Sequence, residues 1–97
     1  MNKLIKVTLK HKNQRKIDDA SDYFASLLRA SFGSRILGPE SPYISRIRNL
    51  YYKNILIKIE QSASITSAKN ILRVLANKVL VNNLYRSIRI DIDVDPL

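Results

Sequence analysis

Cysteine is absent from this 97-residue sequence, which excludes disulfides, thiolate zinc sites and cysteine nucleophiles together. Glycine occurs only at Gly33 and Gly38, so the sequence has no glycine-rich loop to cradle a phosphate. No window approaches the ~20 apolar residues of a membrane span, and lysines interrupt the apolar stretch at the amino terminus where a signal peptide would be continuous. We therefore expect a cytoplasmic protein without a membrane partner.

Acidic residues are also scarce. Asp and Glu number 8 against 17 Lys and Arg, which leaves a net charge of +9. A positive field of this strength on so small a chain favours a polyanionic partner. Hydrophobic residues make up 45% of the sequence, enough to bury a core, and the length suits a single domain of residues 1–97.

The amino-terminal third of the sequence predicts a strand followed by a helix. Apolar and polar residues alternate from Lys3 to His11, which is typical of a half-buried strand. Apolar residues then recur at three- and four-residue spacing from Ile17 to Ser31, which predicts a helix, and Gly33 is expected to end it as a left-handed cap. Acidic residues in the early turns of this helix would suit its dipole: Asp18, Asp19 and Asp22.

The middle of the sequence predicts a rigid connection and then two strands. The prolines at Pro39 and Pro42 favour an extended connection after the first helix, because proline lacks the N–H that a sheet needs. The β-branched and aromatic run that follows predicts strands from Tyr43 to Arg48 and from Tyr51 to Glu60, with a turn near Asn49.

A second helix and a last strand complete the expected order. Ser62 or Ser64 can cap the helix, which should extend close to Val81. Its expected apolar stripe consists of Ile65, Ala68, Leu72, Leu75 and Val79, widened by Ile71 and Val74. The stretch from Ser87 to Val94 alternates again and predicts the last strand.

This β-α-β-β-α-β order predicts an α+β fold. With right-handed crossovers, both helices cover one face of a four-stranded, mostly antiparallel sheet in a two-layer, ferredoxin-like or split βαβ arrangement. The first and third strands are central neighbours in the usual strand order. The other face of the sheet is then open to solvent.

The open face and its edge combine cations with an exposed aromatic ring. Lysines can neutralise phosphates, arginines can clamp or stack, and a tyrosine can stack on a base. The candidate nucleic-acid-binding residues are Lys6, Lys10, Arg46, Arg48, Tyr52 and Lys58. The alternative is a solvated basic face whose arginines pair with the carboxylates of the last strand.

The chemistry of an enzyme or a metal site finds little support. Asp91, Asp93 and Asp95 alternate along the last strand, but no nearby acidic residue completes the ligand shell of a metal ion, so we expect no metal. We instead interpret Asp91 and Asp93 as partners for Lys6 and Lys10 across the strand pair. His11 is the only histidine, and no catalytic constellation accompanies it. Acylphosphatase-like and RNA-recognition-motif interpretations both fail for lack of their glycine-containing motifs.

Two runs of the sequence contain distinctive motifs: FGSRILGPESPYISRIRNLYYKNILIKIE and RSIRIDIDVDPL. Within them the motifs are Leu37-Gly38-Pro39, Pro42, Ser45-Arg46-Ile47-Arg48, Tyr52-Lys53, the strand Ile55 to Ile59, and Asp93-Val94-Asp95-Pro96. Together these motifs resemble the carboxy-terminal domain of the PriA family (primosomal protein N′), the bacterial replication-restart DNA helicases.

The resemblance implies a module that binds DNA and docks proteins, and is not itself an enzyme. Family members use ATP to unwind DNA from three-prime to five-prime, recognise stalled forks and nucleate primosome assembly. ATP and zinc would belong to upstream domains of a longer protein, so no cofactor is expected here, and residues 1–2 would be an added start. The implied partners are single-stranded and forked DNA, the helicase body of the same polypeptide, other primosome proteins and single-stranded-DNA-binding protein, in the bacterial cytoplasm at the nucleoid.

Two alternatives remain beside this interpretation. A free-standing RNA-binding protein of ribosomal type has a similar fold, and a small-molecule regulatory or acyl-phosphate enzyme domain would need a concave pocket.

The sequence also departs from the family at the start of the second helix. Many members have an arginine there, where the acidic tail of single-stranded-DNA-binding protein is thought to dock, whereas Lys69 is the nearest cation here.

Overall fold

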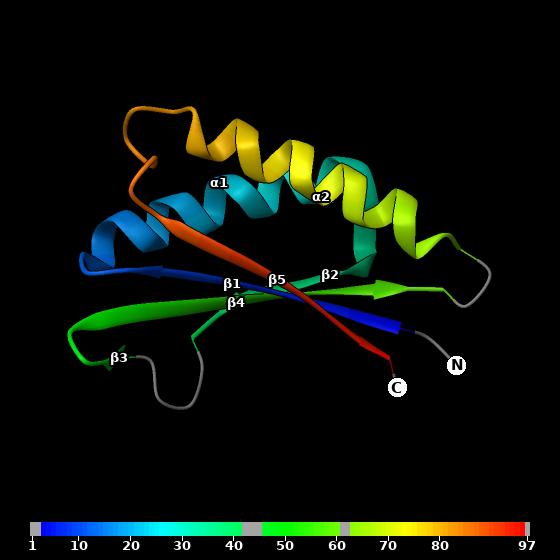
Figure 1. Ribbon diagram of the computed structural model, residues 1–97, viewed down its shortest axis with the longest axis horizontal. Helices are drawn as coiled ribbons and strands as arrows, with labels where there is room; N and C mark the ends of the chain where they lie inside the picture. The colour runs from blue at the N-terminus through cyan, green and yellow to red at the C-terminus, as the bar shows by residue number, and fades with distance from the viewer. Residues whose placement is uncertain (1–2, 42–45, 61–62, 97) are drawn as a thin grey trace.

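The computed structural model describes residues 3–41, 46–60 and 63–96, and for residues 46–47 and 95–96 it describes the backbone alone. Both helices lie on one face of a single sheet, which gives two layers (Figure 1). The elements in chain order are β1 (Lys3–His11), α1 (Gln14–Phe32), the 3-10 turn η1 (Gly33–Arg35), β2 (Ile36–Glu40), β3 (Arg46–Ile47), β4 (Leu50–Ile59), α2 (Ile65–Leu80) and β5 (Arg89–Pro96).

The sheet has the order β2-β4-β1-β5, and every pairing is antiparallel. The first strand and the strand after the hairpin are therefore central neighbours, as predicted. Because β1 occupies one edge of β4 along its length, β2 and β3 share the other edge and form one interrupted strand. The predicted α+β fold, with the order β-α-β-β-α-β, is confirmed in this form.

The expected connection after the first helix was wrong, because residues from Ile36 to Glu40 form strand β2. Ile36 pairs with Ile57 and is buried against the core, and this burial outweighs the turn signal of Pro39. The register shifts between Leu37 and Glu40, and such an irregular edge tolerates a proline. Of the strand predicted from Tyr43 to Arg48, β3 retains only two residues, and residues 43–45 lie outside the described part of the chain.

The predicted turn near Asn49 is confirmed as a two-residue hairpin loop. Arg48 and Asn49 both have positive φ, at 52° and 66°, and Ile47 pairs with Leu50 across the loop. Positive φ at both central residues is the signature of a type I′ turn, whose twist matches that of the flanking strands. The loop thereby fixes where β4 begins.

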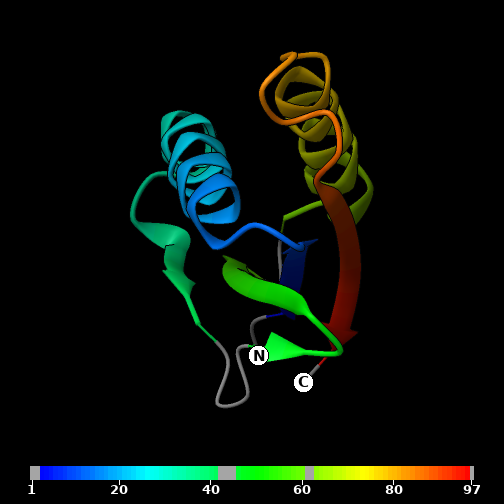
Figure 2. The same cartoon turned by 90° about the vertical axis from the view of Figure 1, so that its left-hand side faces the viewer.

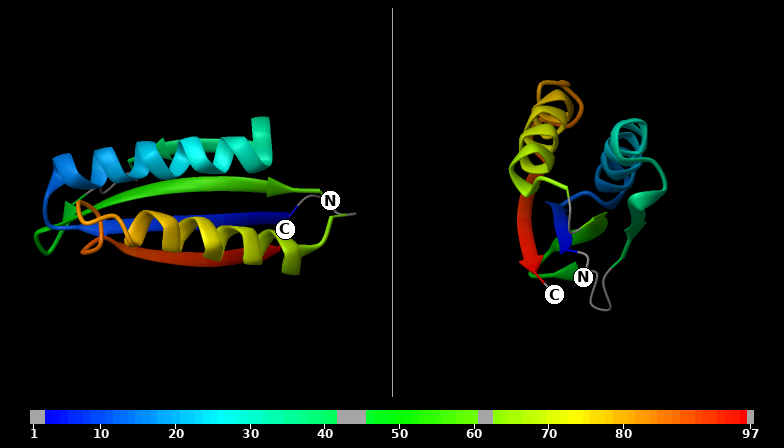
Figure 3. Two further views of the ribbon diagram at one scale, coloured as in Figure 1. Left: turned by 90° about the horizontal axis from the view of Figure 1, so that it is seen from above. Right: turned by 90° about the vertical axis from the view of Figure 1, so that its right-hand side faces the viewer.

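The core lies between the helices and the odd-numbered residues of the central strands, such as Val7 and Ile57. The helices lie side by side over the sheet (Figure 3), and α2 buries Leu72 and Val79. Ile71 and Val74, expected to widen its apolar stripe, are instead 39% and 66% exposed, because they turn away from the sheet. Within the described residues, no helix is both long and apolar enough to cross a membrane.

Candidate functional site

The sheet face away from the helices carries the even-numbered residues of β1 and β4. The register places Lys6 opposite Leu56 of β4 and Asp93 of β5. Two residues further along β1, Thr8 donates a hydrogen bond from Oγ1 to Asn54 Oδ1 over 3.3 Å. The open face is therefore a mixed surface of cations, carboxylates and apolar side chains.

Lys10 sits between an aromatic ring and a carboxylate on this face. Its Nζ lies 6.0 Å from the ring centroid of Tyr52 and 3.2 Å from Asp91 Oδ2. The first contact is a cation–π arrangement and the second an ion pair between partly exposed side chains. The ion pair between Lys10 and Asp91 and the pairing of Lys6 with Asp93 confirm the prediction that carboxylates of the last strand lie across from lysines of the first strand.

The remaining predicted site residues are spread along the molecule. Lys58 is exposed at the far end of β4, opposite Leu4. Arg48 is exposed in the hairpin turn, close to the end of β1. The backbone of Arg46 pairs with that of Tyr51, and the side chain of Arg46 lies outside the described part. The structure thus brings Lys10 and Tyr52 together and leaves Lys58 apart from them.

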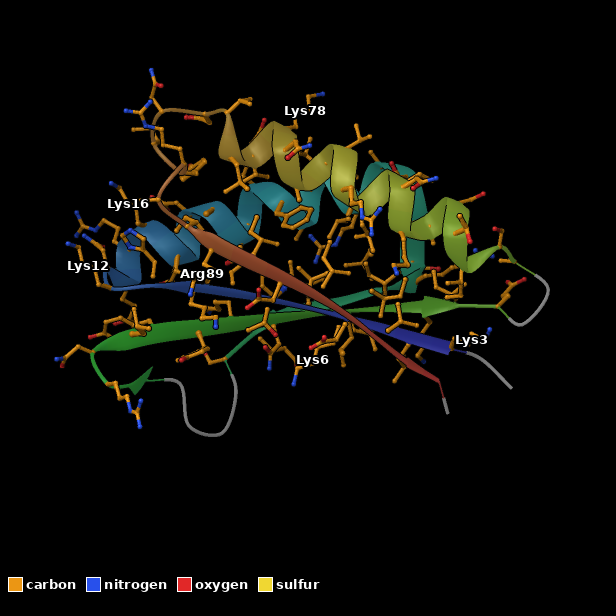
Figure 4. The ribbon with its side chains drawn as sticks, viewed as in Figure 1. Lys3, Lys6, Lys12, Lys16, Lys78 and Arg89 are labelled. Atoms are coloured by element: carbon orange, nitrogen blue, oxygen red, sulfur yellow. The ribbon has the colours of Figure 1, made fainter. Side chains whose placement is uncertain are left out.

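A denser group of cations lies at one end of the molecule. Three segments meet there: the β1–α1 junction, the β3–β4 turn and the α2–β5 connection (Figure 2). We call this the basic end, and its described cations are Lys10, Lys12, Arg15, Lys16, Arg48, Arg86 and Arg89. Figure 4 shows Lys12, Lys16 and Arg89 at this end and Lys3 at the opposite one.

Most of the described cations of this end have no carboxylate within ion-pair distance. Among the described residues, Lys10 is the only cation of the basic end with a carboxylate within 4.0 Å. Mutual repulsion between cations held so close costs free energy, and a bound polyanion would relieve it. The basic end therefore gathers six described cations that have no carboxylate within 4.0 Å in the described part of the chain.

The start of α1 adds to this imbalance. Asn13 caps the helix by accepting a hydrogen bond from the Lys16 backbone N–H over 3.1 Å. The first turn contains no acidic residue but two cations, Arg15 and Lys16, although a helix N-terminus favours negative charge. The expectation that acidic residues support the dipole was wrong in its position, since the helix begins at Gln14 and Asp18 falls in the second turn.

The expected cap Gly33, at the other end of the helix, has positive φ, but its ψ of −134° is not that of a left-handed helix.

His11 ties the segments of the basic end together. It is 8% exposed, and its Nδ1 accepts a hydrogen bond from the Asn13 backbone N–H over 2.9 Å. Because Nδ1 is an acceptor, Nε2 carries the proton of the neutral ring and donates it to Ser87 Oγ over 2.8 Å. The ring thus joins the end of β1 to the residues that precede β5.

A cavity of about 330 Å³ opens at this junction. Its walls come from the end of β1, the first residue of β4 and the start of β5, and the lining residues are Lys10, His11, Lys12, Leu50, Ser87 and Arg89. The volume is in the range of small-molecule sites, which span about 300–1,000 Å³. The cavity combines cationic groups, a hydroxyl and one apolar wall.

Sequence reasoning missed most of the basic end. It selected Lys10 and Arg48 but not Lys12, Arg15 or Arg89. One signal was available: residues 10–16 contain four Lys or Arg and no acidic residue, at a junction where a strand becomes a helix. In the part of the chain that the structure describes, no three His, Asp or Glu side chains gather as a metal site would require.

The fold and the basic end define a small, strongly basic, two-layer α+β domain. The family model for the Primosomal protein N C-terminal domain matches residues 1–97. The chain belongs to this family, as the motifs around Gly38 and Asp93 indicated. It is a C-terminal domain of a primosomal protein, with a role in replication restart.

Two solved structures share the fold. The de novo designed protein Foldit4 has a TM-score of 0.69 and 4% identity, over 100% of this chain and 99% of that one. A hydantoinase/carbamoylase family amidase from Burkholderia ambifaria has a TM-score of 0.52 and 12% identity, over 98% of this chain and 28% of the amidase. At these identities the likeness concerns the fold alone. Comparison with curated proteins finds no match.

Proposed function

We propose that the chain is a DNA-binding module of the replication-restart machinery and that the basic end is its principal contact with DNA. The observation that carries this proposal is the group of six cations from three separate segments, none with a carboxylate within 4.0 Å among the residues that the structure describes. Lys and Arg side chains that neutralise phosphates release counterions, and this release supplies most of the affinity for nucleic acid without regard to sequence. Membership of a primosomal family makes DNA the polyanion to test first.

The open sheet face extends this contact from its neighbouring end. Tyr52 presents a half-exposed ring beside Lys10, at the edge of the face nearest the basic end. Such a ring offers a stacking surface to an unpaired base. A strand of DNA that begins at the basic end would therefore cross Tyr52 before it meets the more distant Lys6 and Lys58.

The experiment compares two variants of equal net charge. One replaces Lys12, Arg15 and Arg86 of the basic end with glutamine, and its control replaces Lys3, Lys69 and Arg73, which lie elsewhere. Binding to single-stranded, duplex and forked DNA is measured by anisotropy over a range of salt. We expect linear plots of log affinity against log salt, with a clearly smaller slope for the first variant, by about 0.7 for each single-strand phosphate that is no longer neutralised.

Three outcomes would overturn the proposal. No binding of the unmodified chain at low salt would remove DNA as the partner, and binding that ignores salt would remove phosphate neutralisation as its basis. Equal loss of slope in both variants would show that overall charge acts and that the basic end is no special contact. A preference for forked over linear DNA would further support a role at stalled forks.

A second candidate function is docking of the open sheet face on the helicase body of the same polypeptide. Its support is a group of leucines on this face: Leu37 is 41% exposed and pairs with Leu56, whose neighbouring strand carries Leu4. A leucine pair beside Lys6 suits a protein partner better than a phosphate backbone. Leu37→Ser and Leu56→Ser should then weaken binding of this chain to the helicase body and leave DNA binding unchanged. Single-stranded-DNA-binding protein and other primosome proteins are proposed as further partners.

A further inference from the structure

The cavity at the basic end contains a hydroxyl donor, Ser87, for which the described part of the chain offers no acceptor. His11 donates to Ser87 Oγ, so the hydroxyl proton of Ser87 is left to donate elsewhere. Among the described residues, no acceptor for this proton lies within hydrogen-bond distance, and Ser87 is exposed where it lines the cavity. The buried imidazole of His11 fixes the position of Ser87 Oγ, so the hydroxyl is held in place before any ligand arrives.

Two cations line the cavity with this hydroxyl, and within the described ranges neither has a carboxylate within 4.0 Å. Lys12 follows directly after β1 and Arg89 begins β5, at the same end of the molecule (Figure 4). Both line the cavity. The other lysine of the lining, Lys10, is occupied by Asp91 at 3.2 Å. A phosphate group between Lys12 and Arg89 would accept from both and from the Ser87 hydroxyl, and the bonds from the two cations are of the charge-assisted kind that binds phosphate most strongly.

The cavity also has room and an apolar wall beyond what a phosphate group needs. Its volume is about 330 Å³, and Leu50 forms the wall contributed by β4. Aliphatic stems of lysine and arginine add to the apolar surface, because such side chains keep only their charged heads in water. A cationic region beside an apolar wall matches a nucleotide, which joins an anionic phosphate to a flat base.

We propose that this cavity holds one nucleotide of a single DNA strand, with the phosphate between Lys12 and Arg89 and the base against Leu50. The proposal rests on the proposed function, since it assigns the ligand of the basic end more closely. In a duplex the base is stacked and paired, and its extrusion costs a few kcal/mol. The cavity therefore favours single strands, whereas the general charge of the basic end serves single strands and duplexes alike.

The test uses three variants of the whole chain. Leu50→Ala removes apolar wall without changing charge, Arg89→Gln removes one phosphate contact, and Arg73→Gln on α2 removes the same charge away from the cavity. The affinity of each variant is measured for a thymidine oligonucleotide and for a hairpin duplex with the same number of phosphates. Thermal melting verifies that each variant is folded.

We expect Leu50→Ala to weaken single-strand binding by about fivefold or more, with an unchanged salt slope and little change for the duplex. Arg89→Gln should weaken single-strand binding several-fold more than Arg73→Gln does. Thymidine monophosphate alone should shift the NMR signals of Lys12, Leu50, Ser87 and Arg89 in the unmodified chain. This last measurement needs no variant and therefore does not depend on how well the variants fold.

The contrary results are distinct from a failure of DNA binding itself. Equal losses for single strand and duplex in Leu50→Ala would overturn the nucleotide cavity while DNA binding stands. Signal shifts by the monophosphate that avoid these four residues would do the same. If the unmodified chain bound neither DNA at low salt, the proposed function would fail together with this inference.

Discussion

Lys53 of β4 reaches the first helix, where its Nζ lies 3.4 Å from Asp18 Oδ1. That oxygen is closed off from solvent, and it has no hydrogen bond among the described residues. The ammonium group is therefore its charge compensation. The pair joins the helix layer to a central strand next to the basic end. Because Lys53 is engaged in this ion pair, we do not count Lys53 among the cations available to DNA.

Replacing Lys53 with methionine should destabilise the fold by about 1–3 kcal/mol, because it leaves a buried carboxylate oxygen without a partner. The measurement is urea unfolding followed by circular dichroism. Lys58→Met is the matched control, since Lys58 is exposed on the same strand. A loss for Lys53→Met no larger than that of the control would show that the pair contributes nothing.

Ile57 lies on the buried face of β4 at 0% exposure, whereas its neighbour Lys58 is exposed. Ile57→Ala should cost about 2–5 kcal/mol of stability, because it leaves a cavity between the sheet and the helices. Lys58→Ala should be nearly neutral. Chemical unfolding of the two variants checks the register, and similar losses would contradict it.

Gly38 holds β2 close to β4 in a backbone conformation that other residues rarely adopt. Its φ is +101°, and a Cβ built at this position would lie 2.9 Å from the Asn54 carbonyl oxygen. Gly38→Ala should therefore cost at least about 1–3 kcal/mol. Gly33→Ala is an informative comparison, since Gly33 also has positive φ, at +64°, but apart from its chain neighbours no atom of the described residues lies within 4 Å of the added carbon. Thermal melting should show the larger loss for Gly38→Ala, and the reverse order would refute the close approach.

The sequence predicted the parts of the fold that depend on residues close to one another along the chain. Alternation along β1 indicated which side chains the helices cover, and the turn at Asn49 followed from the residues around it. Strand β2 was missed because its pairing with β4 depends on contacts distant in sequence, while Gly38 and Pro39 carry a strong local turn signal. The basic end was missed for the same reason, since its cations come together only when three segments meet.

Tyr52 offers a test of stacking on the open face. Tyr52→Ala should weaken binding to single-stranded DNA by about 1–3 kcal/mol and affect duplex binding less, because paired bases cannot stack on the ring. Tyr52→Phe is the control, since it keeps the ring and removes only the hydroxyl. Anisotropy titrations with both DNA forms decide the matter, and unchanged single-strand affinity in Tyr52→Ala would remove Tyr52 from the interface.

The ion pair between Lys10 and Asp91 allows a gain of affinity to be predicted. Asp91→Asn would release Lys10 from its ion pair and remove a negative charge from the part of the open face close to the basic end. Removing one such repulsion near a phosphate is worth about 1 kcal/mol in water at 4 Å, or roughly fivefold in affinity.

The control for this gain is Asp22→Asn, which makes the same change in net charge on the exposed side of α1, away from the sheet. Over the range of salt used for the unmodified chain, we expect Asp91→Asn to bind DNA more tightly and Asp22→Asn to differ by less than about twofold, because distant exposed charges are screened. Equal gains in the two variants would mean that DNA responds only to net charge. No gain in either would exclude Lys10 from the contact, both as a cation of the basic end and as the neighbour of Tyr52 on the open face.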